Sequence, residues 1–370
     1  MGGVTSPHEN EANHQRSCIR WWRLLSGAML AATLALGLVL TLVGQAHFLF
    51  APVAYMPHVF VGPVLMAWAL PGWWWGRRLG ALLLLTGLVF HFCLLGWKLP
   101  PSMVKPVQNL RVAFVNRGDQ DQGAWEKWIV KQQPDLIGLT DVRGKDGAGL
   151  GVGLPVVAGL PYLMRVGEHV LASRYPFKGT QVIRPEATPG AAGRVQYLPA
   201  ARFEVDVPGG PIAVYVVHLR SPRDALSKYR SPKMWKWTLF GVPAHVSPTI
   251  TIDHYWKEQA VVLEGILKRI EAETLPVLVL GDWNLPDFGP RYRRLTRSLL
   301  DAHLEGGSGF GHTFPGDMSH WAAFGLPWMR IDYVLTDRRH WRVEECQVQS
   351  AEEAAKSQHR ALFVRLWMKP

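Results

Sequence analysis

A carboxylate and an amide follow one apolar segment at a spacing that suits phosphate or metal chemistry. Residues 276–280 are apolar and lead into Gly281-Asp282-Trp283-Asn284, so Asp282 and Asn284 lie two residues apart at the end of a predicted strand. Side chains at that spacing point to the same side of a strand. Together they could bind a hard cation, or orient a phosphate and its attacking water. An ordinary turn after a strand uses the same residue types, so this motif alone leaves both interpretations open.

Two histidines and a second aspartate lie near the ends of other apolar segments. His218 ends one segment, Asp332 lies near the start of another, and Ser357-Gln358-His359 begins 25 residues after Asp332. An aspartate that accepts a hydrogen bond from a histidine ring fixes the tautomer of that ring and raises its basicity. Each residue alone is more often structural. Their order along the chain is what favours a catalytic interpretation.

The elements that must position these residues follow an α/β pattern. Strands are predicted at 110–116, 136–140, 171–173, 201–207, 212–218, 276–280, 331–335, 343–348 and 361–367, and helices at about 124–132 and 257–270. Several of the strands end in a polar residue. This pattern predicts a layered α/β domain with its chemistry at the strand ends.

The ordered set of motifs resembles the endonuclease/exonuclease/phosphatase superfamily, which includes DNase-I-like nucleases, inositol-polyphosphate phosphatases and neutral sphingomyelinases. The set comprises Asn116, Asp141, Ser173-Arg174-Tyr175-Pro176, Val217-His218-Leu219, Gly281-Asp282-Trp283-Asn284, Thr313-Phe314-Pro315, Arg330-Ile331-Asp332-Tyr333 and Ser357-Gln358-His359. The resemblance covers about residues 110–367. It implies an α/β/β/α sandwich of four layers, DNase-I-like, with a Mg²⁺ or Mn²⁺ ion at one edge of two packed sheets.

The resemblance also implies a role for each matching residue. Asn116 and Asp141 would hold the metal ion, and Gln358 would flank it. Asp282 and Asn284 would position the water and the phosphate, and His218 would contact the phosphate. His359, paired with Asp332, would act as general acid/base or stabilise the developing charge.

Two positions depart from the family pattern. Thr140-Asp141 stands where the family usually has Gln-Glu, and Gln358 stands where it usually has aspartate. Asp141 keeps the charge but is one methylene shorter than glutamate, and Mg²⁺ requires its oxygen ligands at about 2.0–2.1 Å. Gln358 removes a negative charge. We therefore hypothesise weak metal binding with activity retained. The alternative is a catalytically weakened, membrane-tethered binding module.

The substrate class stays open at the level of sequence. The formal net charge of +11 suits a phosphate ester, an anionic lipid surface or nucleic acid. Residues 221–256 combine lysines with aromatics such as Trp235 and Trp256, which fits either a partly packed loop or a lid that contacts headgroups or bases. A phosphodiester or phosphomonoester hydrolase is the leading interpretation, and an extracytoplasmic DNA endonuclease or exonuclease is the alternative. No feature of the sequence identifies a protein partner.

The first hundred residues predict a membrane anchor. Segments 24–43, 48–75 and 79–97 contain no Asp, Glu, Lys or Arg, and about 20 apolar residues cross a bilayer core. The predicted organisation is an N-terminal cytoplasmic tail (1–20), an anchor of three transmembrane helices (21–97), a proline-rich linker (98–109) and the catalytic domain (110–370). A signal peptide cleaved near Ala46 is the alternative for the first segment.

The arginines near these segments predict their orientation. Arg16, Arg20 and Arg23 flank the first segment, Arg77 and Arg78 lie in the turn before the third, and the loop between the first two has no Lys or Arg. Positive residues in short loops stay in the cytoplasm. The sequence therefore predicts a multi-pass protein of the inner (cytoplasmic) membrane, with the lipid bilayer as its partner and the catalytic domain on the extracytoplasmic side.

Reporter fusions test this orientation. A C-terminal alkaline phosphatase fusion is expected to be active, because that enzyme forms its disulfides only outside the cytoplasm. A fluorescent protein fused to the same C-terminus is expected to be dark, because the general export pathway would carry it across the membrane unfolded. The reverse pattern would show that the catalytic domain faces the cytoplasm.

Overall fold

The computed structural model describes most of the 370-residue chain. The described residues are 7–99, 110–118, 123–142, 157–184, 198–230, 248–316, 325–350, 352–354 and 357–369. The predicted linker therefore lies outside the described residues except for Lys98 and Leu99, and so do the lysines and tryptophans of the proposed lid between 231 and 247.

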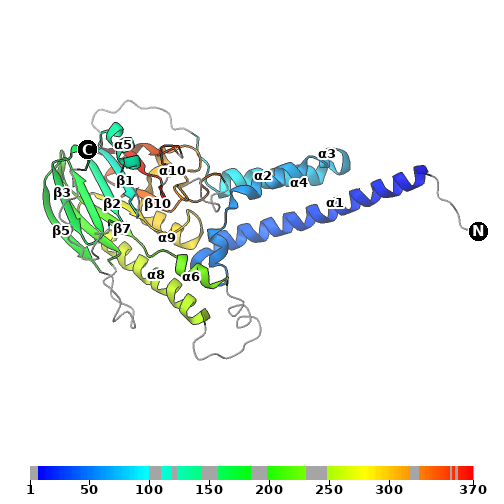
Figure 1. The fold of residues 1–370 in the computed structure, drawn as a ribbon, viewed down its shortest axis with the longest axis horizontal. Coiled ribbons are helices and arrows are strands. Elements are labelled where there is room, and N and C mark those ends of the chain that lie inside the picture. Colours follow the sequence, from blue (N-terminus) through cyan, green and yellow to red (C-terminus); the bar gives the residue numbers. More distant parts are fainter. Residues whose placement is uncertain are drawn as a thin grey trace, which may run out of the picture.

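Two six-stranded mixed sheets form the centre of the catalytic domain (Figure 1). The first has the order β11-β12-β1-β2-β4-β3 and the second β5-β6-β7-β8-β10-β9. The first sheet contains β1 (Leu110–Asn116), β2 (Leu136–Thr140), β3 (Tyr162–Val166), β4 (His169–Ser173), β11 (Trp341–Val348) and β12 (Leu362–Met368). The second contains β5 (Phe177–Ile183), β6 (Ala200–Val207), β7 (Gly210–His218), β8 (Val277–Asp282), β9 (Leu300–Asp301) and β10 (Asp332–Thr336).

Helices cover the outer faces of both sheets. Those on the outer faces are α5 (Gly123–Gln132), α8 (Pro248–Glu271) and α9 (Gly289–Ser298), with a short 3₁₀ turn, η6 (Val157–Gly159). Two short helices pack elsewhere: α6 (Arg223–Lys228) packs on α8, and α10 (Ala302–Gly306) packs on β11. Trp128 of α5 packs on the outer face of the first sheet, and Leu267 of α8 packs on the outer face of the second. Apolar side chains such as Phe114 and Phe203 fill the space between the sheets. The predicted α/β/β/α layering is confirmed.

Strand register brings three of the predicted site residues together. The strands β7 and β8 are parallel, with His218 opposite Asp282, and β8 and β10 are antiparallel, with Asp282 opposite Asp332. Gly281 permits this close pairing, because a Cβ there would lie 2.5 Å from the Val217 carbonyl oxygen. In the first sheet, Asn116 ends β1 beside Thr140, the last residue of β2.

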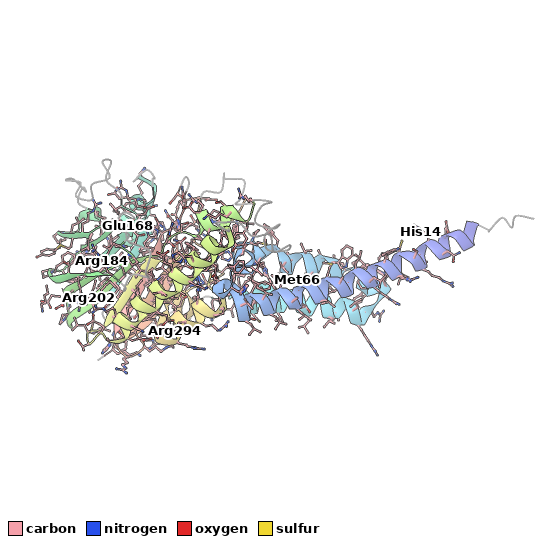
Figure 2. The ribbon with its side chains drawn as sticks, turned by 90° about the horizontal axis from the view of Figure 1, so that it is seen from below. His14, Met66, Glu168, Arg184, Arg202 and Arg294 are labelled. Atoms are coloured by element: carbon pink, nitrogen blue, oxygen red, sulfur yellow. The ribbon has the colours of Figure 1, made fainter. Side chains whose placement is uncertain are left out.

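The N-terminal helices project from one side of the catalytic domain (Figures 1 and 2). They are α1 (Pro7–Leu38), η1 (Val39–Val43), η2 (Gly44–Ala46), η3 (Ala51–Tyr55), η4 (His58–Phe60), α2 (Val61–Ala69), α3 (Gly72–Trp75), α4 (Arg77–Leu88) and η5 (Val89–Leu94). His14 lies near the tip of the projection and Met66 partway along it in Figure 2.

Two of these helical stretches, Asn13–Ala46 and Arg77–Leu94, are long and apolar enough to cross a bilayer by length and composition. The stretch between them, His58–Ala69, is apolar but shorter. Helix α2 packs closely on α4, where a Cβ on Gly62 would lie 2.9 Å from the Gly87 carbonyl oxygen. The structure therefore supports two of the three spans, and the third stays a prediction.

The outer surface of the N-terminal helices is apolar. Leu34, Leu42 and Leu85 are each more than half exposed. The arginines gather at the end far from the catalytic domain, where Arg23 Nη2 donates to the Trp75 carbonyl oxygen at 3.0 Å. Arg77 lies at the same end, over the ring of Trp73.

The structure contains elements that the sequence patterns do not predict. These are β3, β5, α9 and the short elements β9 and α10. Strand β5 is an edge strand with largely exposed side chains, so it has no buried alternating face. Helix α9 contains four arginines in its ten residues, which obscures its narrow apolar face. The loop interpretation of residues 221–256 is correct only in part, because α6 and α8 occupy its two ends and Trp256 is buried.

Candidate active site

The buried carboxylate of Asp282 lies at the centre of the predicted site. Its side chain is 1% exposed. The Asn116 side-chain amide donates to Oδ2 at 2.8 Å, and the Asn284 backbone N–H donates to Oδ1 at 2.8 Å. The Asn284 side-chain amide also donates to Oδ2, at 3.1 Å. Residues from both sheets therefore fix the orientation of this carboxylate.

His359 and Asp332 form the predicted pair. His359 Nδ1 lies 2.9 Å from Asp332 Oδ2 and 3.2 Å from Oδ1, and the opposite ring nitrogen lies 3.9 Å from Asp282 Oδ2. The Thr313-Phe314-Pro315 segment supports the histidine. Phe314 packs on its ring, and the Thr313 carbonyl oxygen accepts from the backbone N–H of Arg360.

The surroundings of these groups separate their pKa values. Burial alone would lower the pKa of His359, but the charge and hydrogen bond of Asp332, with the charges of Asp282 and Asp141, raise it to about 9. Burial, together with the charge of Asp332, raises the pKa of Asp282 to about 6, although the charges of His359 and His218 oppose the rise. Near neutral pH, His359 is therefore a cation. The Asp282 carboxylate beside it is mostly ionised but can still take up and release a proton.

His218 occupies the other side of Asp282. Its Nδ1 lies 2.9 Å from Glu168 Oε1, and its Nε2 lies 3.8 Å from Asp282 Oδ2. Burial lowers the pKa of His218, but the hydrogen bond to Glu168 and the charges of Asp282, Glu168 and Asp141 raise it above its ordinary value. These carboxylates therefore stabilise the protonated ring relative to an ordinary histidine, which suits contact with an anionic group.

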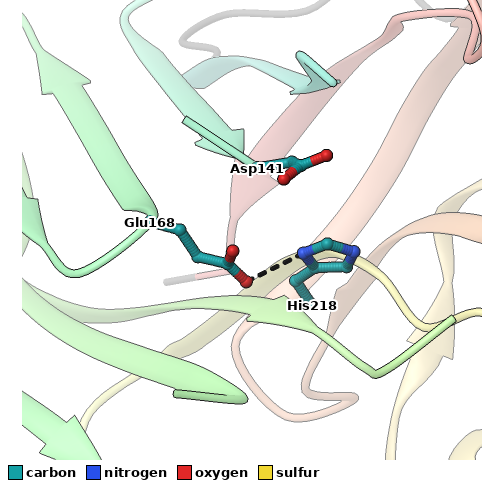
Figure 3. A group of neighbouring side chains, drawn as sticks. All are labelled: Asp141, Glu168 and His218. Atoms are coloured by element: carbon teal, nitrogen blue, oxygen red, sulfur yellow. Dashed lines mark hydrogen bonds and ion pairs between the residues drawn. The ribbon is translucent and has the colours of Figure 1, made fainter. Parts of the chain in front are cut away.

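Asp141 lies across from this pair (Figure 3). One ligand atom from each of Asp141, Glu168 and His218 lies within 4.8 Å of the others. Asp141 follows the end of β2 with φ of 54°. A left-handed backbone at a residue other than glycine is strained, and such strain gathers at functional sites.

Asn284 adopts the same rare backbone conformation, with φ of 48°. Its side-chain amide donates to the Leu219 carbonyl oxygen at 2.8 Å as well as to Asp282. The left-handed turn thus folds Asn284 back against the carboxylate that precedes it by two residues. The predicted pair at the end of β8 is therefore a single hydrogen-bonded unit.

Gln358 is the predicted site residue that the structure does not bring into this cluster. Its side chain is exposed, and Oε1 accepts a hydrogen bond of 3.5 Å from Arg223. Asn116, also predicted to hold the metal, orients Asp282 through its amide nitrogen, and its Oδ1 accepts from the Gly118 backbone N–H.

Two groups of side chains in the described part of the chain have metal-ligand types and spacing. One is Asp141, Glu168 and His218, and the other is Asp282, Asp332 and His359. The second group is fully buried and internally hydrogen-bonded around His359. The first is partly open to solvent and offers two carboxylates, the oxygen donors that Mg²⁺ and Mn²⁺ prefer. Its donor set fits such an ion better.

Comparison with known proteins agrees with this arrangement. Residues 109–359 match the sequence profile of the Endonuclease/Exonuclease/phosphatase family. The chain belongs to that family. No curated protein sequence matches the chain. Membership in this family of hydrolytic phosphoesterases supports hydrolysis of a phosphate ester as the class of reaction, without specifying the substrate.

The solved structures that this chain resembles share little sequence with it. An endonuclease/exonuclease/phosphatase protein from Leptotrichia buccalis is 14% identical over 70% of this chain and 99% of its own, with a TM-score of 0.48. An endonuclease/exonuclease/phosphatase protein from Beutenbergia cavernae is 19% identical over 71% of this chain and 72% of its own, with a TM-score of 0.44. Sphingomyelinase C from Streptomyces griseocarneus is 15% identical over 70% of this chain and 99% of its own, with a TM-score of 0.44.

Glu168 is a site residue that the sequence patterns did not identify. It lies in the turn between β3 and β4, five positions before the Ser173-Arg174-Tyr175-Pro176 motif. No local pattern distinguishes it from a surface glutamate. The one usable signal is its place directly before the buried strand β4, whose first residue, His169, is fully buried.

The protonation state of His359 can be tested directly. In full-length protein labelled with ¹⁵N-histidine, the His359 ring is expected to stay protonated at pH 8, because its pKa is raised to about 9 and the charged form is lost only as pH rises through that value. In Asp332→Asn, burial remains without the main opposing charge, so the ring is expected to be neutral at pH 8. The control Asp337→Asn, beside the exposed His340, should leave the His359 signal unchanged. A neutral wild-type His359 at pH 8 would contradict this charge assignment.

Proposed function

We propose that this protein is a membrane-anchored, metal-dependent phosphoesterase that hydrolyses a phosphodiester or phosphomonoester by attack of water. The observation that carries the proposal is the pair of Asp282 and His359. A buried carboxylate with a pKa of about 6 faces a histidine with a pKa of about 9, at 3.9 Å. An acceptor and a donor of protons held this close suit a reaction in which water is deprotonated while negative charge develops nearby.

Asp282 is the proposed acceptor of the water proton. Its pKa near 6 leaves it mostly ionised at neutral pH yet basic enough to take a proton. Asn116 and Asn284 hold its oxygens by their amide N–H groups. These amides restrict the directions from which a water can approach the carboxylate, so they orient the attack.

The two histidines are the proposed contacts for the phosphate. Both have raised pKa values and flank Asp282, at 3.8 Å for His218 and 3.9 Å for His359. Protonated imidazole rings in these positions stabilise the negative charge that builds up on phosphate oxygens. His359 can also donate a proton to the leaving oxygen, with Asp332 keeping the ring oriented.

The proposed metal ligands are Asp141 and Glu168. The family pattern also implies Asn116 and Gln358, but the structure leaves Gln358 outside this cluster and uses Asn116 to orient Asp282. A Mg²⁺ or Mn²⁺ ion bound there would polarise the phosphate as a Lewis acid. Glu168 supplies a negative charge to the site, whereas Gln358 has replaced the family's aspartate and lies exposed beside Arg223.

The proposed location is the extracytoplasmic face of the inner membrane. The two long apolar helices, their exposed leucines and the arginines at the far end support this arrangement. The bilayer is then the partner of the N-terminal helices, and the catalytic domain projects from the side opposite the arginines.

Hydrolysis of defined phosphate esters tests the proposal. Full-length protein in detergent with Mg²⁺ or Mn²⁺ is expected to cleave bis(p-nitrophenyl) phosphate. Asp282→Ala and His359→Ala should each reduce turnover by at least about a hundredfold, the scale for losing a positioned acid or base. His340→Ala, which removes an exposed histidine that also pairs with an aspartate, should leave turnover unchanged.

The other interpretations predict different results in the same assay. Cleavage of plasmid DNA in preference to the small ester and to phospholipid vesicles would favour the nuclease. Hydrolysis of none of the three, with no metal uptake, would favour the binding module. Folded Asp282→Ala and His359→Ala variants with full turnover would contradict the assignment of the site.

A calorimetric titration of Mn²⁺ into the full-length protein tests the metal ligands. Glu168→Gln is expected to weaken binding by at least about tenfold, the scale for losing a residue that holds or supports a metal ion. Gln358→Asp is expected to leave the affinity unchanged, because this side chain is exposed. Tighter binding in Gln358→Asp, with no effect of Glu168→Gln, would place the ion at the family's usual position instead.

A further inference from the structure

The N-terminal helices contact the active site as well as the surface of the catalytic domain. After the first apolar helix ends at Ala46, the chain turns back along the catalytic domain, and the Tyr55 hydroxyl donates to the Asn284 carbonyl oxygen at 2.8 Å. These residues are 229 positions apart in sequence. A segment between the two candidate membrane spans thus bonds to a proposed catalytic residue.

The Asn284 carbonyl group is a sensitive place for such a contact. With φ of 48°, Asn284 is held in a strained conformation that must be stabilised by its neighbours. Its N–H and side chain bond to Asp282 and Leu219 within the catalytic domain. Tyr55 binds the remaining backbone group from outside that domain. The next carbonyl, that of Leu285, accepts from the Tyr333 hydroxyl of β10 at 2.7 Å.

Tyr55 is itself held firmly. Its ring stacks on Trp256, with centroids 5.9 Å apart, and Trp256 is 1% exposed on α8. The Trp256 ring N–H donates to the Tyr229 hydroxyl, which in turn donates to the Phe48 carbonyl oxygen. The segment that carries Tyr55 is therefore fixed at two points, and the Tyr55 hydroxyl is directed at the active-site turn.

The residues after Asn284 also pack on the N-terminal helices. Phe288 contacts the cluster that includes Leu40 and Phe90. The backbones approach closely at Gly289, where a Cβ would lie 3.1 Å from the Leu40 carbonyl oxygen. The turn from β8 into α9 is thus enclosed between the active site on one side and the end of the first apolar helix on the other.

We propose that Tyr55 is a positioning residue for Asn284, so that the N-terminal helices set the geometry of the Asp282–Asn284 pair as well as attaching the domain. The inference rests on the proposed function for its effect on turnover. In the described part of the chain, the Tyr55 hydroxyl bonds to the Asn284 carbonyl oxygen rather than to the side chains of Asp282, His218 or His359. Its loss therefore lowers the rate of the chemical step and leaves substrate binding as it was.

Two variants of full-length protein in detergent test this role. Tyr55→Phe removes only the hydroxyl that reaches Asn284, and Tyr229→Phe removes a hydroxyl from the same interface that bonds to Phe48 instead. With bis(p-nitrophenyl) phosphate, Tyr55→Phe is expected to lower kcat about tenfold at unchanged KM, within the scale for slight misplacement of a catalytic group. Tyr229→Phe is expected to keep the wild-type kcat.

Hydrogen exchange provides a readout that does not depend on activity. The Asn284 amide bonds to Asp282 Oδ1, and its exchange is expected to be faster in Tyr55→Phe than in the wild type and in Tyr229→Phe. Unchanged exchange in Tyr55→Phe, or equal acceleration in both variants, would overturn the positioning role whatever the kinetics. A wild type that hydrolyses nothing would refute the proposed function, and the exchange comparison would then decide this inference alone.

Discussion

The buried carboxylate of Asp282 is the group on which the arrangement of the site depends. A carboxylate removed from water is costly unless hydrogen bonds and opposite charges replace its hydration. Asn116 from one sheet, Asn284 from the following turn, and the rings of His218 and His359 surround it. Solvating this one group therefore requires the ends of β1, β7 and β8 and the segment before β12 to converge. The same convergence forms the proposed catalytic centre.

Sequence patterns predict most of this convergence, because the residues involved follow buried strands. The predicted bounds of β1 and β2 match the structure, and those of β7, β8 and β10 differ by only a few residues. Long apolar segments determine those strands, and a polar residue at a strand end must lie at the edge of its sheet. The family resemblance of the ordered motifs then implies which strand ends meet. The pairing of Asp332 with His359 is implied by that resemblance and is present in the structure.

The remaining features depend on contacts between distant segments that no local pattern encodes. Glu168 lies in a turn and reaches His218 only because β4 and β7 come together across the sheets. The Tyr55 contact to Asn284 arises from the docking of the N-terminal helices, which apolar composition alone cannot orient. Gln358 is exposed and contacts Arg223 of α6, a helix within a segment whose sequence suggested a loop. Strands at sheet edges and arginine-rich helices such as α9 likewise lack a clear apolar period.

Locating a bound manganese ion tests the account of the site most directly. Crystals of the full-length protein grown with Mn²⁺ and measured at the manganese absorption edge give the position of the ion without assumptions about the ligands. The account predicts an anomalous peak within coordination distance of the Asp141 and Glu168 carboxylates, beside His218 and facing Asp282. A peak held by Gln358 and remote from Glu168, or no peak at any of these side chains, would contradict it.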